Sequence, residues 1–275
     1  MTGALDIRSV RAIDIHGHVG RYHGSALDLI DGFYSGGPED VLRRAAWANV
    51  EYTFVSPLGA IFIHFGGDSV AANRELAAEI RRFPGLFHWV VVEPGRPESF
   101  AQAEALLKTA RCVGIKIHPE LHTYPIKEHG AKIFEFAAKQ GAVILSHSGE
   151  ELSSPPDFIP FADEFPGVKL ILAHIGWSRD GNMTRQVKAV QMSKHGNIFA
   201  DTSSSMSITS NLIEWAVSEA GPERILFGSD TPLYFAPVQR ARIDRAEISD
   251  KAKKMILRGN AERLFRGKLG PQSKA

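Results

Sequence analysis

The sequence RAIDIHGHV, residues 11–19, is an apolar, β-branched run that carries one histidine on each side of a glycine. Such a run predicts a buried strand. No glycine-rich GxGxxG loop follows it, which argues against a dinucleotide-binding open sheet. Amphipathic helical stretches alternate with seven further runs of this kind. The eight predicted strands cover residues 11–19, 52–57, 86–94, 112–119, 142–148, 169–176, 197–203 and 224–230. Eight strand–helix units predict an α/β fold, a (β/α)8 TIM barrel.

The segments between the strands carry helix start and stop signals. Asp68 is a candidate N-cap for a helix over residues 68–83. Gly141 ends a helical pattern over residues 131–141 and suits a left-handed C-cap. These signals agree with a ring of helices around the strands.

Two segments depart from a plain strand–helix alternation. Residues 251–265 predict two helices broken at Gly259, with Asn260 as the cap of the second. Residues 20–37 are too long and too glycine-rich for a plain connection, so they predict a loop over one mouth of the barrel.

Length and composition favour one globular domain. We expect residues 1–275 to form a single barrel domain, with a helical extension from about residue 250 and a short polar tail from about residue 267. The 32 basic residues are balanced by 31 acidic ones, which excludes the basic surface typical of nucleic-acid-binding proteins. The N-terminus lacks the apolar core of a secretory signal, and no apolar run approaches the ~20 residues of a membrane span. We therefore expect a cytoplasmic protein with no membrane partner.

The chemistry gathers at the predicted strand ends. His16 and His18 end the first strand and, by strict alternation, share a face with Asp14. About 0.4 HxH triplets are expected by chance in a chain of this composition, so the motif alone is weak. Four more ionisable residues occupy the same place on other strands: His118, His147, His174 and Asp230. Because the strand ends of a barrel meet at one mouth, we expect these side chains to converge.

Imidazole and carboxylate groups together suit a divalent transition metal such as zinc, manganese or iron. The single cysteine, Cys112, excludes a thiolate cluster and leaves nitrogen and oxygen ligands. The sequence therefore predicts a metal site at the mouth of the barrel.

The order of these residues resembles the amidohydrolase superfamily. The strings IDIHGHV, GIKIHPE, VILSHSG, FPGVKLILAHIG, ILFGSDTP and ILRGNAERLF are similar to its amidohydrolase-related (amidohydrolase 2) branch. That branch includes aminocarboxymuconate-semialdehyde decarboxylase and several lactone hydrolases. The resemblance runs from about residue 11 to 266, with six motifs in the same order.

The resemblance implies specific roles. His16, His18, His147 and Asp230 would bind one divalent metal ion, zinc in the first place, with manganese and iron as alternatives. His174 would lie close to the metal-bound water. Asp230 would also take or relay a proton from that water.

The fourth strand departs from the family members that bind two metals. Those members carry a bridging carboxylated lysine or a glutamate at its end, whereas GIKIHPE places Lys116 two residues deeper than His118. Lys116 could be carboxylated and bridge two metals, or form a buried ion pair, for example with Asp14. We prefer one metal, with His118 as a substrate contact or an outer partner of the metal site. Trp177 follows the sixth strand and is a second candidate for the substrate pocket.

Three functions are compatible with this pattern. The first is a metal-dependent hydrolase of a small carboxylated ester, lactone or amide. The alternative is a metal-dependent, non-oxidative decarboxylase (a lyase) of an aromatic or muconate-type acid. The third is a barrel that binds a metal or ligand without catalysis, which the presence of both Asp230 and His174 disfavours, because a structural metal site needs no acid–base group beside it.

Two further expectations concern substrate and partners. Arg21, Arg179 and Arg185 lie in loops that could reach the mouth and clamp a substrate carboxylate. Exposed apolar residues at Ile61, Phe62 and Ile63 would suit a homodimer contact.

Overall fold

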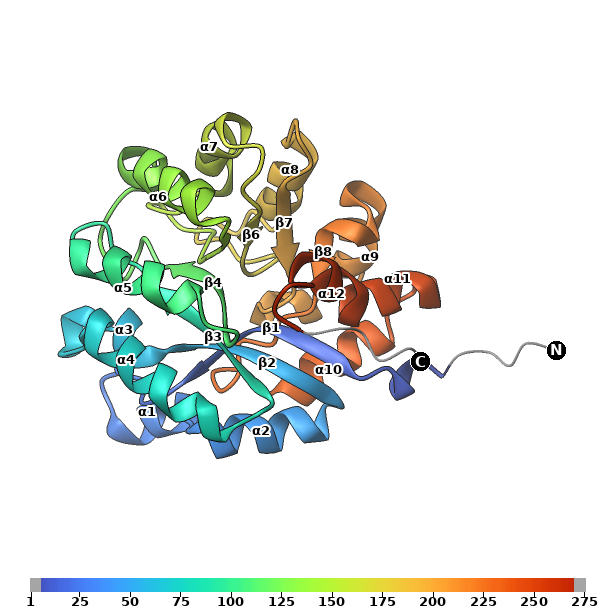
Figure 1. Cartoon of the computed structure of the whole chain (residues 1–275). Coiled ribbons are helices and arrows are strands. Elements are labelled where there is room, and N and C mark those ends of the chain that lie inside the picture. Colours follow the sequence, from blue (N-terminus) through green and yellow to red (C-terminus); the bar gives the residue numbers. More distant parts are fainter. Residues whose placement is uncertain (1–5, 270–275) are drawn as a thin grey trace.

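The computed structural model describes residues 6–269 of the chain, and Figure 1 shows its strands surrounded by helices. All eight strands are parallel and neighbour one another in chain order, from β1 to β8. Their bounds are β1 Ala12–Val19, β2 Val50–Pro57, β3 Leu86–Val91, β4 Cys112–Ile117, β5 Val143–Ser146, β6 Leu170–Leu172, β7 Ile198–Asp201 and β8 Ile225–Leu226. The predicted (β/α)8 barrel is confirmed.

The barrel closes between β1 and the segment after β8. Because β8 has only two residues, closure depends on backbone hydrogen bonds beyond it. Ile15 donates to the Phe227 carbonyl (3.0 Å), Asp230 donates to the His16 carbonyl (2.7 Å), and His18 donates to the Thr231 carbonyl (2.6 Å). At Gly17, a Cβ atom would lie 2.9 Å from Thr53 Cγ2 and 3.1 Å from Thr231 Cγ2, so only glycine fits between the two histidines.

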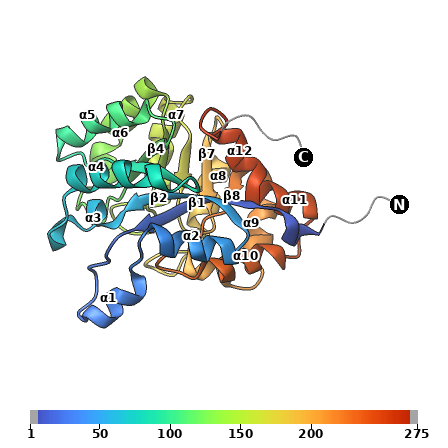
Figure 2. The same cartoon turned by 60° about the horizontal axis from the view of Figure 1, so that its bottom comes forward.

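Helices cover the outside of the barrel, as both cartoon views show (Figure 2). The α-helices are α1 Asp28–Tyr34, α2 Pro38–Trp47, α3 Leu58–Ile61, α4 Ser69–Glu79, α5 Pro97–Leu107, α6 Ile126–Gln140, α7 Ile159–Glu164, α8 Arg185–Met192, α9 Leu212–Ala220, α10 Ala236–Asp244, α11 Asp250–Lys254 and α12 Asn260–Leu264. Shorter helical turns are η1 Ile7–Ser9, η2 Ile63–Phe65, η3 Ile80–Arg82, η4 Pro155–Phe158, η5 Ser205–Ile208, η6 Pro222–Arg224 and η7 Met255–Gly259.

The predicted helix caps at two positions are confirmed. The Asp68 carboxylate accepts a hydrogen bond from the Ala71 N–H at 2.7 Å and so caps α4. Gly141 adopts φ 62° directly after α6, the left-handed conformation that glycine tolerates best. Helix α6 begins at Ile126, five residues before the predicted start.

The predicted break at Gly259 is wrong. The chain runs from α11 through η7, a π-helical turn, into α12 without leaving helical geometry. Asn260 has helical dihedrals, and its side-chain amide donates to the carbonyls of Pro222 and Ile225, each at 2.7 Å. These two tertiary hydrogen bonds replace the capping role that the local sequence suggested.

The segment 20–37 differs from a simple loop, since it contains helix α1 and an antiparallel bridge between Gly20 and Gly36. It does lie over the mouth, because Tyr22 and Gly24 line the cavity described below. Helix α1 projects from the lower edge of the barrel in Figure 2.

Two apolar layers hold the barrel together. An inner cluster takes at least one residue from each of the eight strands, so it fills the barrel interior. Phe265, which follows α12, packs on Phe54 and Trp89 with ring centroids 5.0 and 5.6 Å apart. A larger cluster lies between the strands and the helices and includes Phe134 of α6 and Ile213 of α9.

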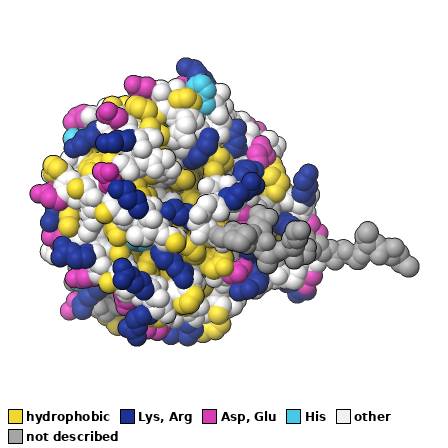
Figure 3. All heavy atoms as spheres, viewed as in Figure 1, with side chains coloured by type: hydrophobic (Ala, Val, Ile, Leu, Met, Phe, Trp, Pro, Cys, Tyr) yellow, Lys and Arg dark blue, Asp and Glu magenta, His cyan; other side chains and the backbone are white. Residues whose placement is uncertain are grey.

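Among the described residues, none of the helices has both the length and the apolar character needed to cross a bilayer. On the face shown in Figure 3, basic side chains lie among acidic and apolar ones. That residues 1–275 form one domain stays a prediction, and most of the expected polar tail, residues 270–275, lies outside the described residues.

Replacing Trp89 by alanine tests the inner layer. Trp89 is fully buried and its indole N–H donates to the Ile15 carbonyl at 2.7 Å. We expect Trp89→Ala to lower the free energy of unfolding by about 3–5 kcal/mol, because it leaves a cavity and an unpaired carbonyl. Urea denaturation measures this change. Trp47→Ala is the matched control, since Trp47 is 60% exposed and should cost no more than about 1 kcal/mol. Similar losses for both variants would contradict the proposed packing.

A second prediction concerns acid stability. Burial lowers the pKa of His88 from 6.5 to about 3, and neither ring nitrogen has a hydrogen-bond partner among the described residues. The unfolded chain therefore takes up a proton below about pH 6.5 that the folded chain refuses, so stability falls as pH falls. From about pH 7 to about pH 5, this residue should account for a loss of about 2 kcal/mol.

Unfolding of His88→Leu by urea at the two pH values measures that contribution. We expect its acid-induced loss to be smaller than that of the wild type by the same amount. His195→Leu, at an exposed position, is the control and should behave as the wild type. An unchanged acid response in His88→Leu would rule the explanation out.

Candidate metal and active site

The side chains predicted at the strand ends meet in one cavity of about 470 Å3. His16 and His18 lie within the last four residues of β1, whereas the others lie in loops just beyond the ends of β4, β5, β6 and β8, strands that the sequence had predicted to be longer. The predicted site residues that line this cavity are His16, His18, His118, His147, His174, Trp177 and Asp230. Asp14 does not line it, because the pairing of β1 with β2 is irregular between Asp14 and Gly17 and strict alternation fails there.

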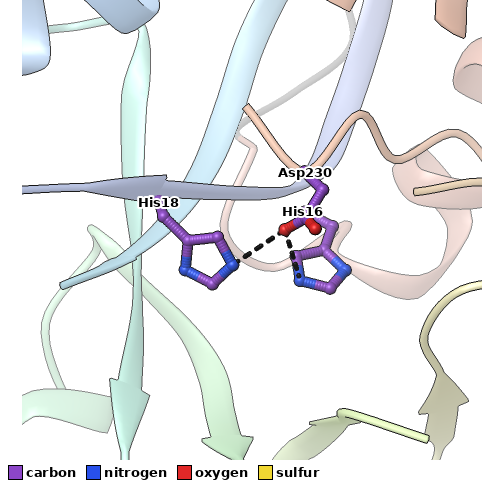
Figure 4. A group of neighbouring side chains, drawn as sticks. All are labelled: His16, His18 and Asp230. Carbon is purple, nitrogen blue, oxygen red and sulfur yellow. Dashed lines mark ion pairs between the residues drawn. The ribbon is translucent and has the colours of Figure 1, made fainter. Parts of the chain in front are cut away.

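Three of these residues form a ligand group. His16, His18 and Asp230 each offer one atom, and the three atoms lie within 4.8 Å of one another. Figure 4 shows both imidazoles turned toward the Asp230 carboxylate. Asp230 Oδ1 lies 2.9 Å from His18 Nε2 and 3.5 Å from His16 Nε2. This buried oxygen nevertheless accepts no well-directed hydrogen bond from the described residues. Two imidazole nitrogens and an unsatisfied carboxylate oxygen around one point are suited to a divalent cation.

Backbone strain marks two of the site residues. Asp230 has φ 59° and His174 has φ 73°, both in the left-handed region that non-glycine residues seldom adopt. A backbone hydrogen bond stabilises this conformation at each residue. The Asp230 N–H donates to the His16 carbonyl, and the His174 N–H donates to Asp201 Oδ1 at 3.0 Å. Strain that the surrounding structure maintains is typical of functional sites.

His147, the fourth ligand implied by the family resemblance, lies outside the ligand group. Its Nε2 is 2.9 Å from Glu150 Oε1, and its Nδ1 is 3.2 Å from His174 Nε2. His118 stacks on its ring with centroids 4.1 Å apart. Both ring nitrogens of His147 are thus engaged. The same is true of His16, whose Nδ1 faces Asp201 and whose Nε2 faces Lys116, so each of the two rings would have to release one partner in order to bind an ion.

Asp201 and Ser203, at the end of β7, were missed by the sequence analysis. Asp201 Oδ2 lies 2.9 Å from His16 Nδ1, and Ser203 Oγ lies 3.0 Å from His16 Nδ1 and 2.8 Å from His174 Nδ1. A carboxylate on Nδ1 orients the ring and leaves Nε2 for a metal. The sequence did contain a signal for Asp201, because the predicted seventh strand, NIFADTS, carries this acid near its end, where the other predicted site residues lie on their strands.

Lys116 is fully buried at the inner end of the site. Its Nζ lies 3.0 Å from His16 Nε2, and burial lowers the pKa of its ammonium group to about 8. The ion pair suggested between Lys116 and Asp14 does not form. Asp14 instead accepts hydrogen bonds from the backbone N–H and hydroxyl of Ser229, and burial raises the pKa of its carboxyl to about 7.

Burial also determines the charge of the imidazoles. It lowers the pKa of His16, His118 and His174 well below the usual value of a histidine, because an imidazolium is poorly solvated there. These rings are therefore neutral at physiological pH. A neutral imidazole is the form that binds a metal.

The walls of the cavity are mainly apolar and aromatic. They include Tyr22, Leu58, Ile61, Phe62, Phe65, Leu121, Leu233 and Tyr234. The expected exposed apolar loop at Ile61-Phe62-Ile63 is wrong, since Ile61 and Phe62 are 2% and 5% exposed and face the cavity. Their burial removes the exposed surface on which the expected dimer contact was based, and a homodimer itself stays a prediction.

The three arginines expected at the mouth do not line the cavity. Arg21 pairs with Asp28 at 2.8 Å, and Arg185 pairs with Asp180. Arg179 borders a neighbouring surface hollow, which shares Glu150 with the cavity. No arginine among residues 6–269 therefore lines this cavity, and Arg179 comes nearest to a lining residue, since its charge acts on the Glu150 carboxylate.

The family model described as amidohydrolase matches residues 13–267. No curated protein sequence matches the chain.

Several solved structures share the fold. A dihydroxybenzoic acid decarboxylase from Polaromonas sp., with bound manganese and the inhibitor 2-nitroresorcinol, has TM-score 0.73 and 16% identity, covering 93% of this chain and 96% of that chain. 5-Carboxyvanillate decarboxylase from Sphingomonas paucimobilis has TM-score 0.70 and 16% identity, covering 94% and 99%. An amidohydrolase described as putative from Staphylococcus aureus has TM-score 0.69 and 13% identity, covering 93% and 99%. At such identities the likeness shows the fold.

The contact between Asp201 and His16 generates a prediction. We expect Asp201→Asn to weaken binding of Mn2+ by about 10–100-fold, because the imidazole loses the carboxylate that orients it and raises its basicity. Calorimetric titration of metal-free protein with MnCl2 measures this. Asp28→Asn, at a carboxylate that is 92% exposed, removes the same charge far from the site and should bind as the wild type. Equal affinities for all three proteins would show that Asp201 does not support a ligand.

Proposed function

The chain belongs to the amidohydrolase family, and from this premise we propose that it is a metal-dependent decarboxylase of a small aromatic carboxylic acid. The observation that carries the proposal is the cavity, which joins the ligand group of His16, His18 and Asp230 to aromatic and apolar walls without an arginine. A substrate carboxylate would therefore find its positive partners in a bound cation and in Lys116, which also lines the cavity. Decarboxylases of dihydroxybenzoic acid and 5-carboxyvanillate on the same fold support this direction.

The residues fit a divalent ion. Asp230 Oδ1 is buried, accepts no well-directed hydrogen bond, and lies against two imidazole nitrogens. We propose His16, His18 and Asp230 as ligands of the ion. We also propose His147, the predicted fourth ligand. When bound, the ion would supply a positive charge that binds a substrate oxygen and stabilises negative charge near it. Manganese, present in three of the similar structures, is our first choice for a test, with zinc as the alternative.

Decarboxylation needs a proton for the carbon that loses carbon dioxide. The bond to the carboxyl group breaks, its electron pair stays on the ring carbon, and that carbon takes one proton. Asp230 and His174 are the residues that we assign to hold and move this proton. His174 is suited to a relay, because its Nε2 faces His147 and its Nδ1 faces Ser203. The apolar walls would keep bulk water from the reacting carbon.

Hydrolysis of a small carboxylated ester, lactone or amide is the second candidate. One observation favours it: Asp230 Oδ1, the carboxylate oxygen of the ligand group, accepts no well-directed hydrogen bond from the described residues, so this carboxylate is available as a base that takes a proton from water. The similar structures nevertheless support decarboxylation over hydrolysis, which reverses the order suggested by the sequence.

The two candidates differ in their products. We expect the Mn2+-loaded protein, tested with a panel that includes 2,6-dihydroxybenzoate and 5-carboxyvanillate, to release carbon dioxide. In D2O, one deuterium should appear on the ring carbon that carried the carboxyl group. Removing the metal with a chelator should abolish turnover, and added Mn2+ should restore it, because the cation binds the carboxylate.

Asp230→Asn should lose metal and activity together, whereas Asp28→Asn should retain both. Turnover of lactones with oxygen from labelled water, without carbon dioxide from any acid, would replace the decarboxylase proposal by the hydrolase. A metal-free protein with full activity would contradict both.

A further inference from the structure

Helix α1 turns its apolar side chains to the solvent. Among its described residues Asp31 alone is buried, and its carboxylate accepts hydrogen bonds from the N–H and the hydroxyl of Ser25. Leu29 and Phe33, four residues apart and so on one face of the helix, are 69% and 63% exposed. A helix on the surface of a globular protein normally turns its apolar face to the core. The apolar face of α1 is therefore left uncovered by the described chain.

The exposed apolar surface continues from α1 onto α10 and η5. Gly36, which follows α1, lies against Pro232, since a Cβ atom added to it would be 3.1 Å from Pro232 Cβ. Both cartoon views place α1 and α10 along the same edge of the barrel (Figure 1 and Figure 2). Gln239 of α10 accepts a hydrogen bond from the Ser207 hydroxyl at 2.7 Å and so holds η5 beside α10. The apolar rim is the set of large exposed apolar side chains on these elements and their N-caps: Leu27, Leu29, Phe33, Met206, Ile208, Phe235 and Val238.

The apolar rim is large for a surface that faces water. Its side chains are between 37% and 69% exposed, so together they offer on the order of 700 Å2. The largest apolar patch of a typical monomer covers about 300–600 Å2, whereas each partner of a stable interface buries about 800 Å2. The rim is thus of the size that a second protein covers.

The composition around the rim favours a protein partner. No lysine occurs in residues 1–107 or 195–250, which supply all three elements, and every lysine of the chain lies in the remaining segments. The cores of protein interfaces are depleted in lysine and enriched in aromatic side chains and methionine. A helix that lies on a membrane instead carries basic residues on its polar face, and the charged residues of α1 are Asp28 and Asp31.

The order of the three elements makes the rim complementary to itself. Because α10 lies between α1 and η5, a two-fold axis at α10 would bring α1 of one copy opposite η5 of the other, at two equivalent places. Phe235 and Val238, three residues apart, would lie near the axis. Trp47 touches Phe235 at the edge of the rim, with ring centroids 6.1 Å apart. The Arg43 guanidinium already covers Trp47, 5.7 Å from the ring centroid, so Trp47 stays outside the interface core.

We propose that a second copy of this chain covers the apolar rim, and that the two copies form a two-fold symmetric dimer with α1 packed against η5 of the partner. This contact takes the place of the one expected at Ile61 and Phe62. It lies beside the mouth of the cavity, because the segment 20–37 that contains α1 also supplies Tyr22 to the cavity wall, and Tyr234, just before α10, lines the wall as well. The partner therefore supports one wall of the cavity, whichever reaction the cavity performs.

Sedimentation velocity measures the association. We expect the wild type to sediment with twice the mass of one chain at micromolar concentration. Phe33→Glu introduces a charge at both α1 contacts and should weaken the dimer by at least about 100-fold, and Val238→Glu should do the same from α10. Met192→Glu is the matched control and should remain a dimer, since Met192, on α8 outside the rim, is 62% exposed. Circular dichroism should show all three variants folded, because the replaced side chains are exposed.

Hydrogen exchange of the wild type locates the contact without any substitution. Raising the protein concentration through the range in which the dimer forms should slow exchange by at least about tenfold in peptides that cover residues 27–34, 205–208 and 235–241. Exchange in residues 185–192 of α8 should not change.

Three results would overturn the proposal: a wild type that is monomeric at every concentration tested, a dimer that survives both Phe33→Glu and Val238→Glu, or protection confined to other segments. A monomer that cosediments with vesicles of phosphatidylcholine and phosphatidylserine would assign the rim to a lipid surface instead. Loss of the dimer in Met192→Glu as well would contradict the interface, because the added charge and not its position would then cause dissociation.

Discussion

The backbone contact between β1 and the segment after β8 is the constraint on which the site depends. β8 is too short to close the barrel by itself, so the hydrogen bond from the Asp230 N–H to the His16 carbonyl contributes to closure. The same two residues belong to the candidate ligand group. The spacing of the group is therefore set by barrel closure rather than by flexible side chains, and Gly17 permits the close approach that closure requires.

Burial gives this constraint its chemical effect. Inside the barrel a histidine is more stable neutral than charged, so the rings of His16 and His174 are neutral, and a neutral ring is the form in which His16 can bind a cation. Asp201 and Ser203 occupy the Nδ1 atoms of these two rings and so direct their Nε2 atoms toward the cavity. The strained backbone at His174 and Asp230 shows that the fold accepts a local cost to hold these positions.

Much of this arrangement was predictable from local patterns. The alternation of short apolar runs with helical segments identified all eight strands, and Asp68 and Gly141 marked helix ends correctly. The histidines and Asp230 at the strand ends were expected to meet, and they line one cavity. Asp201 carried the same positional signal and was overlooked. The break at Gly259 failed because Asn260 is used by tertiary hydrogen bonds to Pro222 and Ile225, which no local pattern reveals.

By itself, the sequence determined the barrel and the kind of chemistry at its mouth, because strand periodicity and strand-end residues are properties of short segments. Only the tertiary structure decided which atoms face one another, since His16 meets Lys116 from 100 residues away and Asp201 from 185 residues away. In the folded chain Ile61 and Phe62 line the cavity, whereas the three arginines expected at the mouth do not. Loop paths and side-chain partners depend on packing between distant segments, and such packing leaves no periodic signal in the chain.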